Sequence, residues 1–179
     1  MTNKRKTAIV LIDVQGKLAE IMYKSEELLK KLEIIIMGAQ LLNIPIIWTE
    51  QLPNKLGVTN GRISKLLKTQ NPIIKNEFSC VKNAEFSKFI KDHNYNHFLI
   101  CGIEAHVCVY QTAKDLLNIG NDVEIIIDAV SSRSELNRNI GIEKVTSLGG
   151  KITSVEMLLF EKQEIAVGEK FRKLIKIVK

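Results

Sequence analysis

The stretch Thr7-Ala-Ile-Val-Leu-Ile-Asp13 decides the fold, because it is a nearly continuous apolar run that ends on a lone carboxylate. A run of this length without polar alternation is typical of a strand that is buried on both faces. Such strands occur in parallel sheets that carry helices on both sides. We therefore predict a central strand over residues 7–13, with Asp13 at its carboxyl end.

The rest of the chain repeats this pattern, since apolar runs of strand length alternate with segments of helical period. Strands are predicted at residues 7–13, 44–49, 73–76, 97–102, 122–128 and 151–154. Helices are predicted at residues 25–42, 63–68, from Asn83 onward, 105–118, 136–148 and in two closing segments, with a polar loop at 50–61. The pattern indicates an α/β fold of three layers, α/β/α, around a six-stranded, mostly parallel, doubly wound sheet. No linker or repeat interrupts it, so we predict one domain over residues 1–179.

Composition limits the setting in which the protein works. The chain has 179 residues and a net charge of +6, but its basic residues are scattered, so nucleic acid is not expected as a partner. The three cysteines, Cys80, Cys101 and Cys108, have no CxxC spacing, which favours reduced thiols. No apolar stretch approaches the ~20 residues that a membrane span needs. We expect a cytoplasmic protein that does not bind membranes.

Three side chains that carry chemistry stand at or just beyond strand ends. Asp13 closes the first predicted strand, Lys75 closes the third, and Cys108 lies in the first turn of the helix after the fourth. Ligands of open parallel sheets bind beyond the carboxyl ends of the strands. A helix N-terminus and a nearby ammonium favour a thiolate, and a neighbouring carboxylate can take the thiol proton. The alternatives are a core thiol, a carboxylate that caps a turn and a surface lysine.

The motifs around these residues resemble those of the isochorismatase-like cysteine hydrolase superfamily, in order and spacing, over roughly residues 7 to 162. They are Leu11-Ile-Asp-Val-Gln15, Lys75-x-x-Phe78-Ser79, Gly102-Ile-Glu-Ala-His-Val-Cys108 with Val109-Tyr-Gln-Thr-Ala113, Asp128-Ala-Val-Ser-Ser-Arg-Ser134 and Glu156-Met-Leu-Leu-Phe160.

The resemblance implies a catalytic role for Asp13 as the aspartate, Lys75 as the lysine and Cys108 as the nucleophile. A second copy of the lysine motif begins at Lys82, and we choose Lys75 because it directly follows the apolar run Pro72-Ile-Ile and so stands at a strand end. The family usually has a cis peptide before its oxyanion hole, and here that bond would join Ile103 to Glu104. The backbone amides of Glu104 and Cys108 would then face the developing oxyanion.

Departures from the family pattern bear on the substrate class. Nicotinamidases of this superfamily carry an Asp-x-His metal motif after the second strand, whereas this chain reads Trp48-Thr-Glu-Gln-Leu-Pro53. His93, His97 and His106 lie elsewhere and lack ligand spacing, so we predict neither a metal nor a cofactor. Members that cleave isochorismate commonly lack the cysteine, so Cys108 argues against hydrolysis of a vinyl ether.

The expected function is a metal-independent cysteine hydrolase that cleaves a small amide or related carbonyl compound through a thioester. The alternatives are vinyl ether hydrolysis of the isochorismate type and a non-catalytic member that only binds or scaffolds. The substrate-binding residues are expected to be Leu18, Gln51, Phe78 and His106. By the same resemblance we expect a homo-oligomer, a dimer or larger. Cys80, Cys101 and Trp48 are expected to be core residues, and His93 and His97 to be solvated or structural.

Overall fold

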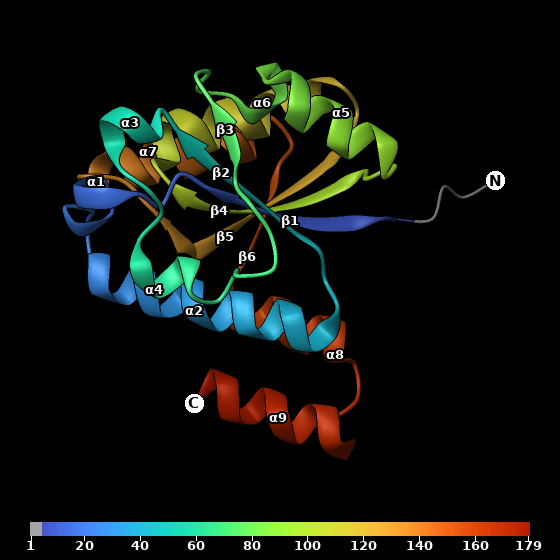
Figure 1. The fold of residues 1–179 in the computed structure, drawn as a ribbon. Coiled ribbons are helices and arrows are strands. Elements are labelled where there is room, and N and C mark those ends of the chain that lie inside the picture. The colour runs from blue at the N-terminus through green and yellow to red at the C-terminus, as the bar shows by residue number, and fades with distance from the viewer. Residues whose placement is uncertain (1–4) are drawn as a thin grey trace.

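The computed structural model describes residues 5–179, so the first four residues of the predicted domain lie outside the described part. Six strands form one sheet in the order β3-β2-β1-β4-β5-β6, and every pairing between them is parallel (Figure 1). The strands are β1 (Thr7–Ile12), β2 (Ile46–Gln51), β3 (Ile73–Lys75), β4 (His97–Ile103), β5 (Asp122–Ser131) and β6 (Lys151–Thr153). The strand order reverses between β1 and β4, as in a doubly wound sheet. The predicted fold class is confirmed, with a sheet that is wholly rather than mostly parallel.

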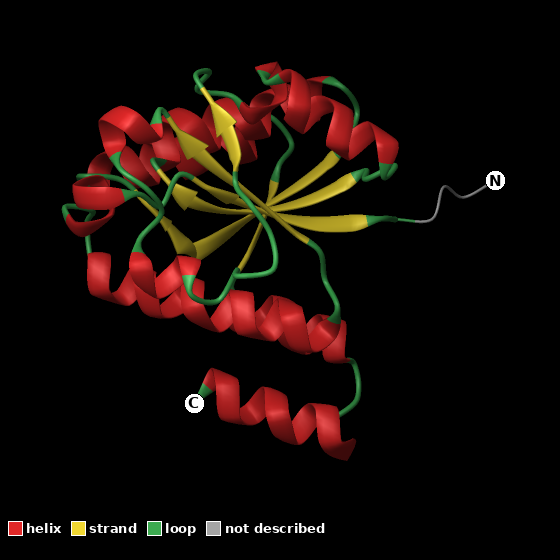
Figure 2. Ribbon diagram, viewed as in Figure 1, coloured by secondary structure: helices red, strands yellow, loops and turns green. Residues whose placement is uncertain are grey.

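Helices cover both faces of this sheet (Figure 2). The α-helices are α1 (Gly16–Glu20), α2 (Ser25–Leu42), α3 (Pro53–Leu56), α4 (Gly61–Ser64), α5 (Ala84–Asp92), α6 (Tyr110–Asn118), α7 (Glu135–Ser147), α8 (Val155–Gln163) and α9 (Gly168–Val178). A 3-10 turn, η1 (Cys80–Lys82), precedes α5, and a π-helical turn, η2 (Ala105–Val109), precedes α6. None of the helices within residues 5–179 has the length and apolar character to cross a membrane.

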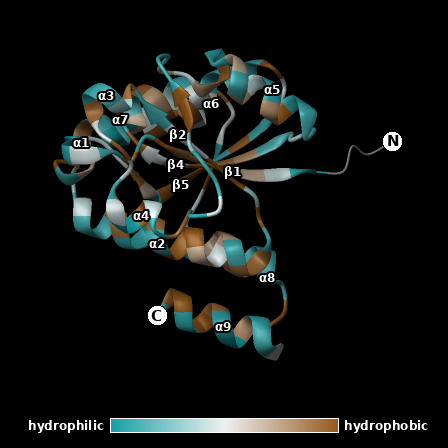
Figure 3. Cartoon of the chain, viewed as in Figure 1, coloured by the Kyte–Doolittle hydropathy of each residue, from teal (hydrophilic) through white to brown (hydrophobic). Residues whose placement is uncertain are grey.

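The core has two halves because β1 sends alternate side chains to opposite faces of the sheet. Ile9 and Leu11 join the apolar cluster under α2 and α8, and Val10 and Ile12 join the cluster under α5, α6 and α7. Figure 3 shows the hydrophobic colour concentrated on the central strands. The last helix, α9, packs against α2 through the buried Leu174 and adds a further layer outside α2.

Two predicted boundaries are wrong in a way that matters for the site. The strand predicted at 44–49 is β2, which starts at Ile46 and continues to Gln51, and the predicted loop at 50–61 also contains α3. Glu50 and Gln51 are polar, but they are buried in the sheet because each has hydrogen-bond partners. The Glu50 carboxylate accepts from the backbone N–H and hydroxyl of Thr59 at 2.7 Å each, and Gln51 lies beside Lys75 in the β2–β3 register.

Other differences are smaller. The strand predicted at 122–128 is β5, which runs on to Ser131, and the helix predicted at 105–118 begins with the π-helical turn η2. The two histidines next to the β4 boundary differ from each other. His93 is exposed and stacks on Phe89, whereas His97 is buried and bonds to Thr7 and Glu124, so its role is structural.

Candidate active site

A buried ion pair lies beyond the carboxyl ends of β1 and β3. Asp13 directly follows β1 with a φ of 50°, and Lys75 is the last residue of β3, with 1% of its surface exposed. The Lys75 Nζ donates to Asp13 Oδ2 at 2.6 Å, to Gln51 Oε1 at 3.0 Å and to the Glu77 carbonyl at 3.1 Å. These bonds satisfy the three protons of an ammonium group. Burial is the largest single influence and by itself would lower the pKa of Lys75. The charge of Asp13, its hydrogen bond to the ammonium and the neighbouring Cys80 and Cys108 together outweigh burial, so the pKa is raised and the lysine is charged.

This geometry separates the two lysine motifs. The side chain of Lys82 is 69% exposed and stands 4.0 Å from Asp115, at the surface. Lys75, by contrast, is completely enclosed and in contact with Asp13.

Thr49 and Cys80 complete the surroundings of Asp13. The Thr49 hydroxyl donates to Asp13 Oδ1 at 2.7 Å, so both carboxylate oxygens are held. Cys80 Sγ lies 4.0 Å from the same hydroxyl, and the backbone N–H of Cys80 donates to the Thr112 hydroxyl at 3.0 Å. Burial raises the pKa of the Cys80 thiol to about 11, so this thiol is neutral at physiological pH.

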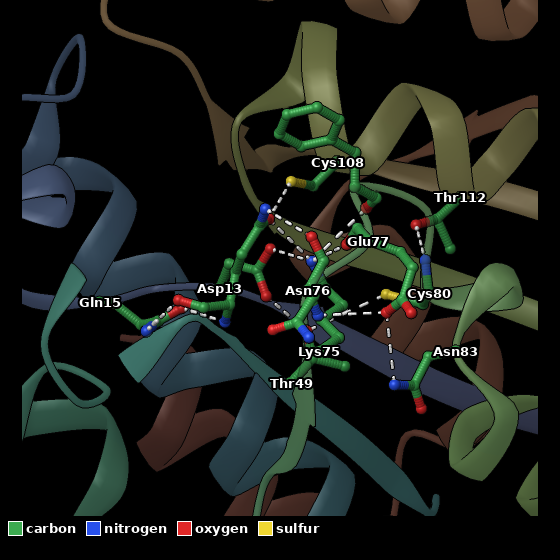
Figure 4. A network of polar contacts seen from close by, with 12 residues as sticks. Asp13, Gln15, Thr49, Lys75, Asn76, Glu77, Cys80, Asn83, Cys108 and Thr112 are labelled. Atoms are coloured by element: carbon green, nitrogen blue, oxygen red, sulfur yellow. Dashed lines mark hydrogen bonds and ion pairs between the residues drawn. The ribbon is translucent and has the colours of Figure 1, made fainter. Parts of the chain in front are cut away.

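Cys108 reaches the ion pair through Gln51. Figure 4 shows Cys108 in the same network of polar contacts as Asp13 and Lys75. The thiol, on η2, is buried and lies 3.1 Å from Gln51 Oε1, the same oxygen that accepts from Lys75. The three predicted catalytic side chains therefore come together at the switch point of the sheet, joined by a glutamine. Gln51, which the sequence predicts to bind substrate, lies at the centre of the network.

The expected low pKa of the Cys108 thiol is wrong for the free protein. Burial, with a further contribution from the negative charge of Asp13, raises this pKa, and Lys75 offsets only part of the effect. A hydrogen bond between the thiol and the Asp13 carboxylate also holds the proton on sulfur and raises the pKa. The amide oxygen of Gln51 faces the sulfur as well, and the Lys75 protons are directed at oxygen atoms. At rest the side chain is thus a neutral thiol.

The backbone beside Cys108 has the predicted special bond. The Ile103–Glu104 peptide is cis, and Gly102 just before it has a φ of 110°. A Cβ on Gly102 would lie 2.1 Å from the Ile12 carbonyl oxygen, so only glycine allows β1 and β4 to approach this closely next to Asp13. The Glu104 carbonyl accepts from the backbone N–H groups of Val107 and Val109, and its carboxylate accepts from the Arg133 backbone and side chain.

The remaining expected substrate-binding residues lie in different surroundings. Phe78 is 53% exposed, and its carbonyl lies 3.5 Å from the Lys75 Nζ. His106 is half-buried, and its Nδ1 is 3.0 Å from the Ser132 hydroxyl. Leu18 lies on α1 and packs against the apolar cluster under α2, so much of its side chain is used by the core.

Two hollows lie away from these side chains. One, of about 390 Å³, is lined by α2, the end of β5 and the start of α7, including Tyr23, Asp128 and Arg138. The other, of about 600 Å³, lies where β1 and β4 begin and includes Lys6 and Tyr95. Asp13, Lys75 and Cys108 line neither hollow.

The side chains after Trp48 do not fit a metal site. Thr49 and Gln51 are bonded within the network, and Glu50 is bonded to Thr59 on the other side of the strand. Within residues 5–179, no group of three or more His, Cys, Asp or Glu side chains is placed to hold a metal ion.

Sequence reasoning missed Gln15 and Thr49 as parts of the site. The Gln15 side chain donates to the backbone carbonyls of Gln51 and Gly57 and accepts from the backbone N–H of Gln51, so it fixes the end of β2. The available signal was the position of both residues, because Gln15 lies just beyond the end of β1 and Thr49 is the last residue of the strand predicted at 44–49.

Comparison with known proteins agrees with this architecture. Residues 7–157 match the family model described as isochorismatase domain. The secreted isochorismatase effector Isc1 of Phytophthora sojae is 32% identical over 97% of this chain and 84% of its own length. Isochorismatase family protein 1B of Dictyostelium discoideum is 32% identical over 97% of this chain and 86% of its own.

Among solved structures, the MAR1 ribonuclease of Caenorhabditis elegans has a TM-score of 0.89 at 32% identity and covers 98% of this chain and 91% of its own. The family model extends across Asp13, Lys75 and Cys108, and the curated relatives match nearly the whole chain. The chain therefore belongs to the isochorismatase family of hydrolases.

Proposed function

We propose that the protein is a cysteine hydrolase that cleaves the C–N bond of a small amide through a covalent thioester. The observation that carries the proposal is the buried chain of contacts from Cys108 through Gln51 and Lys75 to Asp13 at the switch point of the sheet. A buried charged pair beside a buried thiol is costly to assemble, and such groups collect where chemistry needs them. The structures of nicotinamidases from Streptococcus mutans and Bacillus subtilis share the fold, at 18% and 14% identity.

The proposed reaction begins when the Cys108 S–H proton passes to the Asp13 carboxylate and the sulfur attacks the amide carbon. The carbonyl π-electrons move to oxygen, where the backbone amides of Glu104 and Cys108 stabilise the negative charge. Collapse of this intermediate breaks the C–N bond, and the proton on Asp13 goes to the leaving nitrogen. Water, deprotonated by Asp13, then attacks the thioester, which releases a carboxylic acid and returns the proton to the sulfur.

Lys75 has two tasks in this scheme. Its positive charge is paired with the buried Asp13 carboxylate, the group that accepts the thiol proton in this scheme. The same charge offsets the negative charge that develops on sulfur and on the substrate oxygen.

The test is a panel of small aliphatic and aromatic amides, scored for ammonia release. Cys108→Ala is expected to abolish turnover, and Cys101→Ala is the matched control, because Cys101 is a buried thiol on β4 whose Sγ lies near the Val10 carbonyl, outside the network. Mass spectrometry after quenching should detect an adduct on Cys108 alone. Full turnover by Cys108→Ala would refute the covalent scheme.

Metal independence is part of the same proposal. It is supported by the engagement of Thr49, Glu50 and Gln51 in other contacts. Dialysis against EDTA is expected to leave turnover unchanged, and recovery of lost turnover by one added divalent metal would overturn this point.

Two other activities, vinyl ether hydrolysis and RNA cleavage, are measured alongside amide hydrolysis. Vinyl ether hydrolysis needs an acid rather than a nucleophile, so an isochorismate-type activity would survive Cys108→Ala. RNA cleavage is tested because one structural relative is described as a ribonuclease. We expect neither activity, and a protein that binds an amide without turning it over would be a binding member of the family.

We also propose that the protein is a cytoplasmic homo-oligomer, a dimer or larger, that acts on a small molecule. The fold is shared by the Escherichia coli YcaC gene product, described as an octameric hydrolase. Sedimentation of the purified protein tests the assembly, and fractionation of the source cells tests the location.

A further inference from the structure

The amide oxygen of Gln51 contacts both the nucleophile and the lysine of the ion pair. It accepts from the Cys108 thiol at 3.1 Å and from the Lys75 ammonium at 3.0 Å. Chemistry fixes this orientation of the amide, because an ammonium has no acceptor and must face the oxygen rather than the NH₂ group. If the amide were reversed, two donors would face each other.

This orientation favours the neutral thiol. A carbonyl oxygen 3.1 Å from sulfur accepts the S–H proton, but it would repel a thiolate. Lys75 cannot compensate, since its three protons are directed at Asp13, Gln51 and the Glu77 carbonyl. The ammonium can turn a proton toward sulfur when one of these bonds is released, and the bond to Gln51 shares its acceptor with the thiol.

We propose that Gln51 is a positioning residue that keeps Cys108 a neutral thiol at rest, because its amide oxygen accepts both the S–H proton and one proton of the Lys75 ammonium. Movement of its amide oxygen away from this position then allows Asp13 to take the thiol proton and Lys75 to face the sulfur. The inference rests on the proposed function for its meaning in catalysis, but it concerns the thiol itself and is testable without a substrate. Gln51 itself does not titrate. The titratable groups that act on this sulfur are Asp13 after β1, Lys75 on β3 and Cys80 on η1.

The test measures the rate at which iodoacetamide alkylates Cys108 as a function of pH, resolved by mass spectrometry of the Cys108 peptide. Dividing each rate by its plateau at high pH removes differences in access to the thiol. We expect Gln51→Met to shift the midpoint down by about one pH unit, because the acceptor is lost and a Lys75 proton is freed. Below both midpoints this shift makes the normalised rate about tenfold higher than in the wild type.

Gln51→Glu should shift the midpoint in the opposite direction, because it puts a second carboxylate against the sulfur. Gln40→Met is the matched control, since Gln40 lies on α2 and its side chain donates to the Leu66 carbonyl, away from the network. Its profile should match that of the wild type. Thermal unfolding checks that each variant is folded. If Gln51→Met does not fold, Gln51→Asn withdraws the oxygen by one methylene with the amide retained, and a downward shift is expected again.

Shifts of the two Gln51 variants in the same direction, or unchanged midpoints, would overturn the inference. The inference would also be overturned if a Gln51 variant raised KM for an identified amide but kept the alkylation profile of the wild type, because Gln51 would then be a substrate contact only. If no amide in the panel is hydrolysed but the two Gln51 variants still shift the midpoint in opposite directions, only the proposed function is contradicted.

Discussion

Replacement of Lys75 by methionine tests whether the buried ion pair is an energetic unit. Methionine has nearly the length of lysine, so it fills the space but donates none of the three hydrogen bonds. At an effective dielectric constant of about 20, unit charges separated by the observed 2.6 Å attract by about 6 kcal/mol. Much of this attraction only offsets desolvation of the two groups, but the substitution leaves Asp13 buried without a partner charge. The expected loss in the free energy of unfolding is about 3–5 kcal/mol.

Urea denaturation at pH 7.5 measures this loss, and the double variant identifies its cause. Asp13→Asn alone keeps the Thr49 contact, and asparagine tolerates the φ of 50° at this position. In Lys75→Met with Asp13→Asn no charge remains unpaired, so we expect the double variant to recover at least about 2 kcal/mol relative to Lys75→Met. In thermal unfolding the single Lys75 variant should melt about 6–20 °C lower.

The reasoning would be refuted by a Lys75→Met variant within about 1 kcal/mol of the wild type, a change typical of an exposed pair. It would equally fail if the losses of the two single variants simply added in the double variant, because additivity means that the two groups do not interact.

Three further predictions concern the thiols, a helix contact and the end of β2. Burial raises the folded-state pKa of all three thiols above the unfolded value of about 8.5, and that of Cys80 to about 11. Between these two pH values the unfolded chain loses protons that the folded protein keeps, so the free energy of unfolding should fall by about 4 kcal/mol per pH unit. Cys101→Ala should remove about a third of this slope in urea titrations. Gly141→Ala should destabilise the protein by about 1–3 kcal/mol, because the new Cβ would lie 2.5 Å from a backbone carbonyl oxygen of η2. Gly61→Ala is the control, since Gly61 has open space around it, and it should change stability by less than about 1 kcal/mol in the same denaturation assay. Gln15→Leu should lower the free energy of unfolding by about 3 kcal/mol, because it removes two buried hydrogen bonds and one partly buried bond. Hydrogen exchange should then become faster in residues 52–60, and unchanged exchange there would show that Gln15 does not fix the end of β2.

The layers of the fold followed directly from the pattern of apolar residues. A run such as Ala8–Ile12 has few alternatives to a strand buried on both faces, and this pattern fixed the position of Asp13 at the end of the first strand. The boundaries failed at Glu50 and Gln51, because polarity at a strand end normally indicates a loop. Here the polar groups find partners, Thr59 and Lys75, that come from elsewhere in the chain. No local pattern contains that information.

The candidate site was predicted as a set of residues but not as an electrostatic arrangement. Residue order and family resemblance selected Asp13, Lys75 and Cys108, and strand position separated Lys75 from Lys82. The protonation state of Cys108 could not be read in the same way, because it depends on where the Lys75 protons point and on which atom of Gln51 faces the sulfur. Both are properties of packed side chains at distances near 3 Å.

A neutral resting thiol changes how the reactivity of this site should be understood. A cysteine that is ionised at rest reacts with any small electrophile that reaches it, whereas a neutral thiol reacts slowly until its proton leaves. Cys108 is surrounded by a base, a cation and an amide that together could ionise it, yet the observed bonds direct the cation at oxygen and the amide oxygen at the thiol. Small rotations within this group, without any movement of the sheet, would therefore be enough to change the reactivity of the sulfur. The rigid strand ends bring the residues together, and the glutamine between them determines whether the nucleophile is ionised.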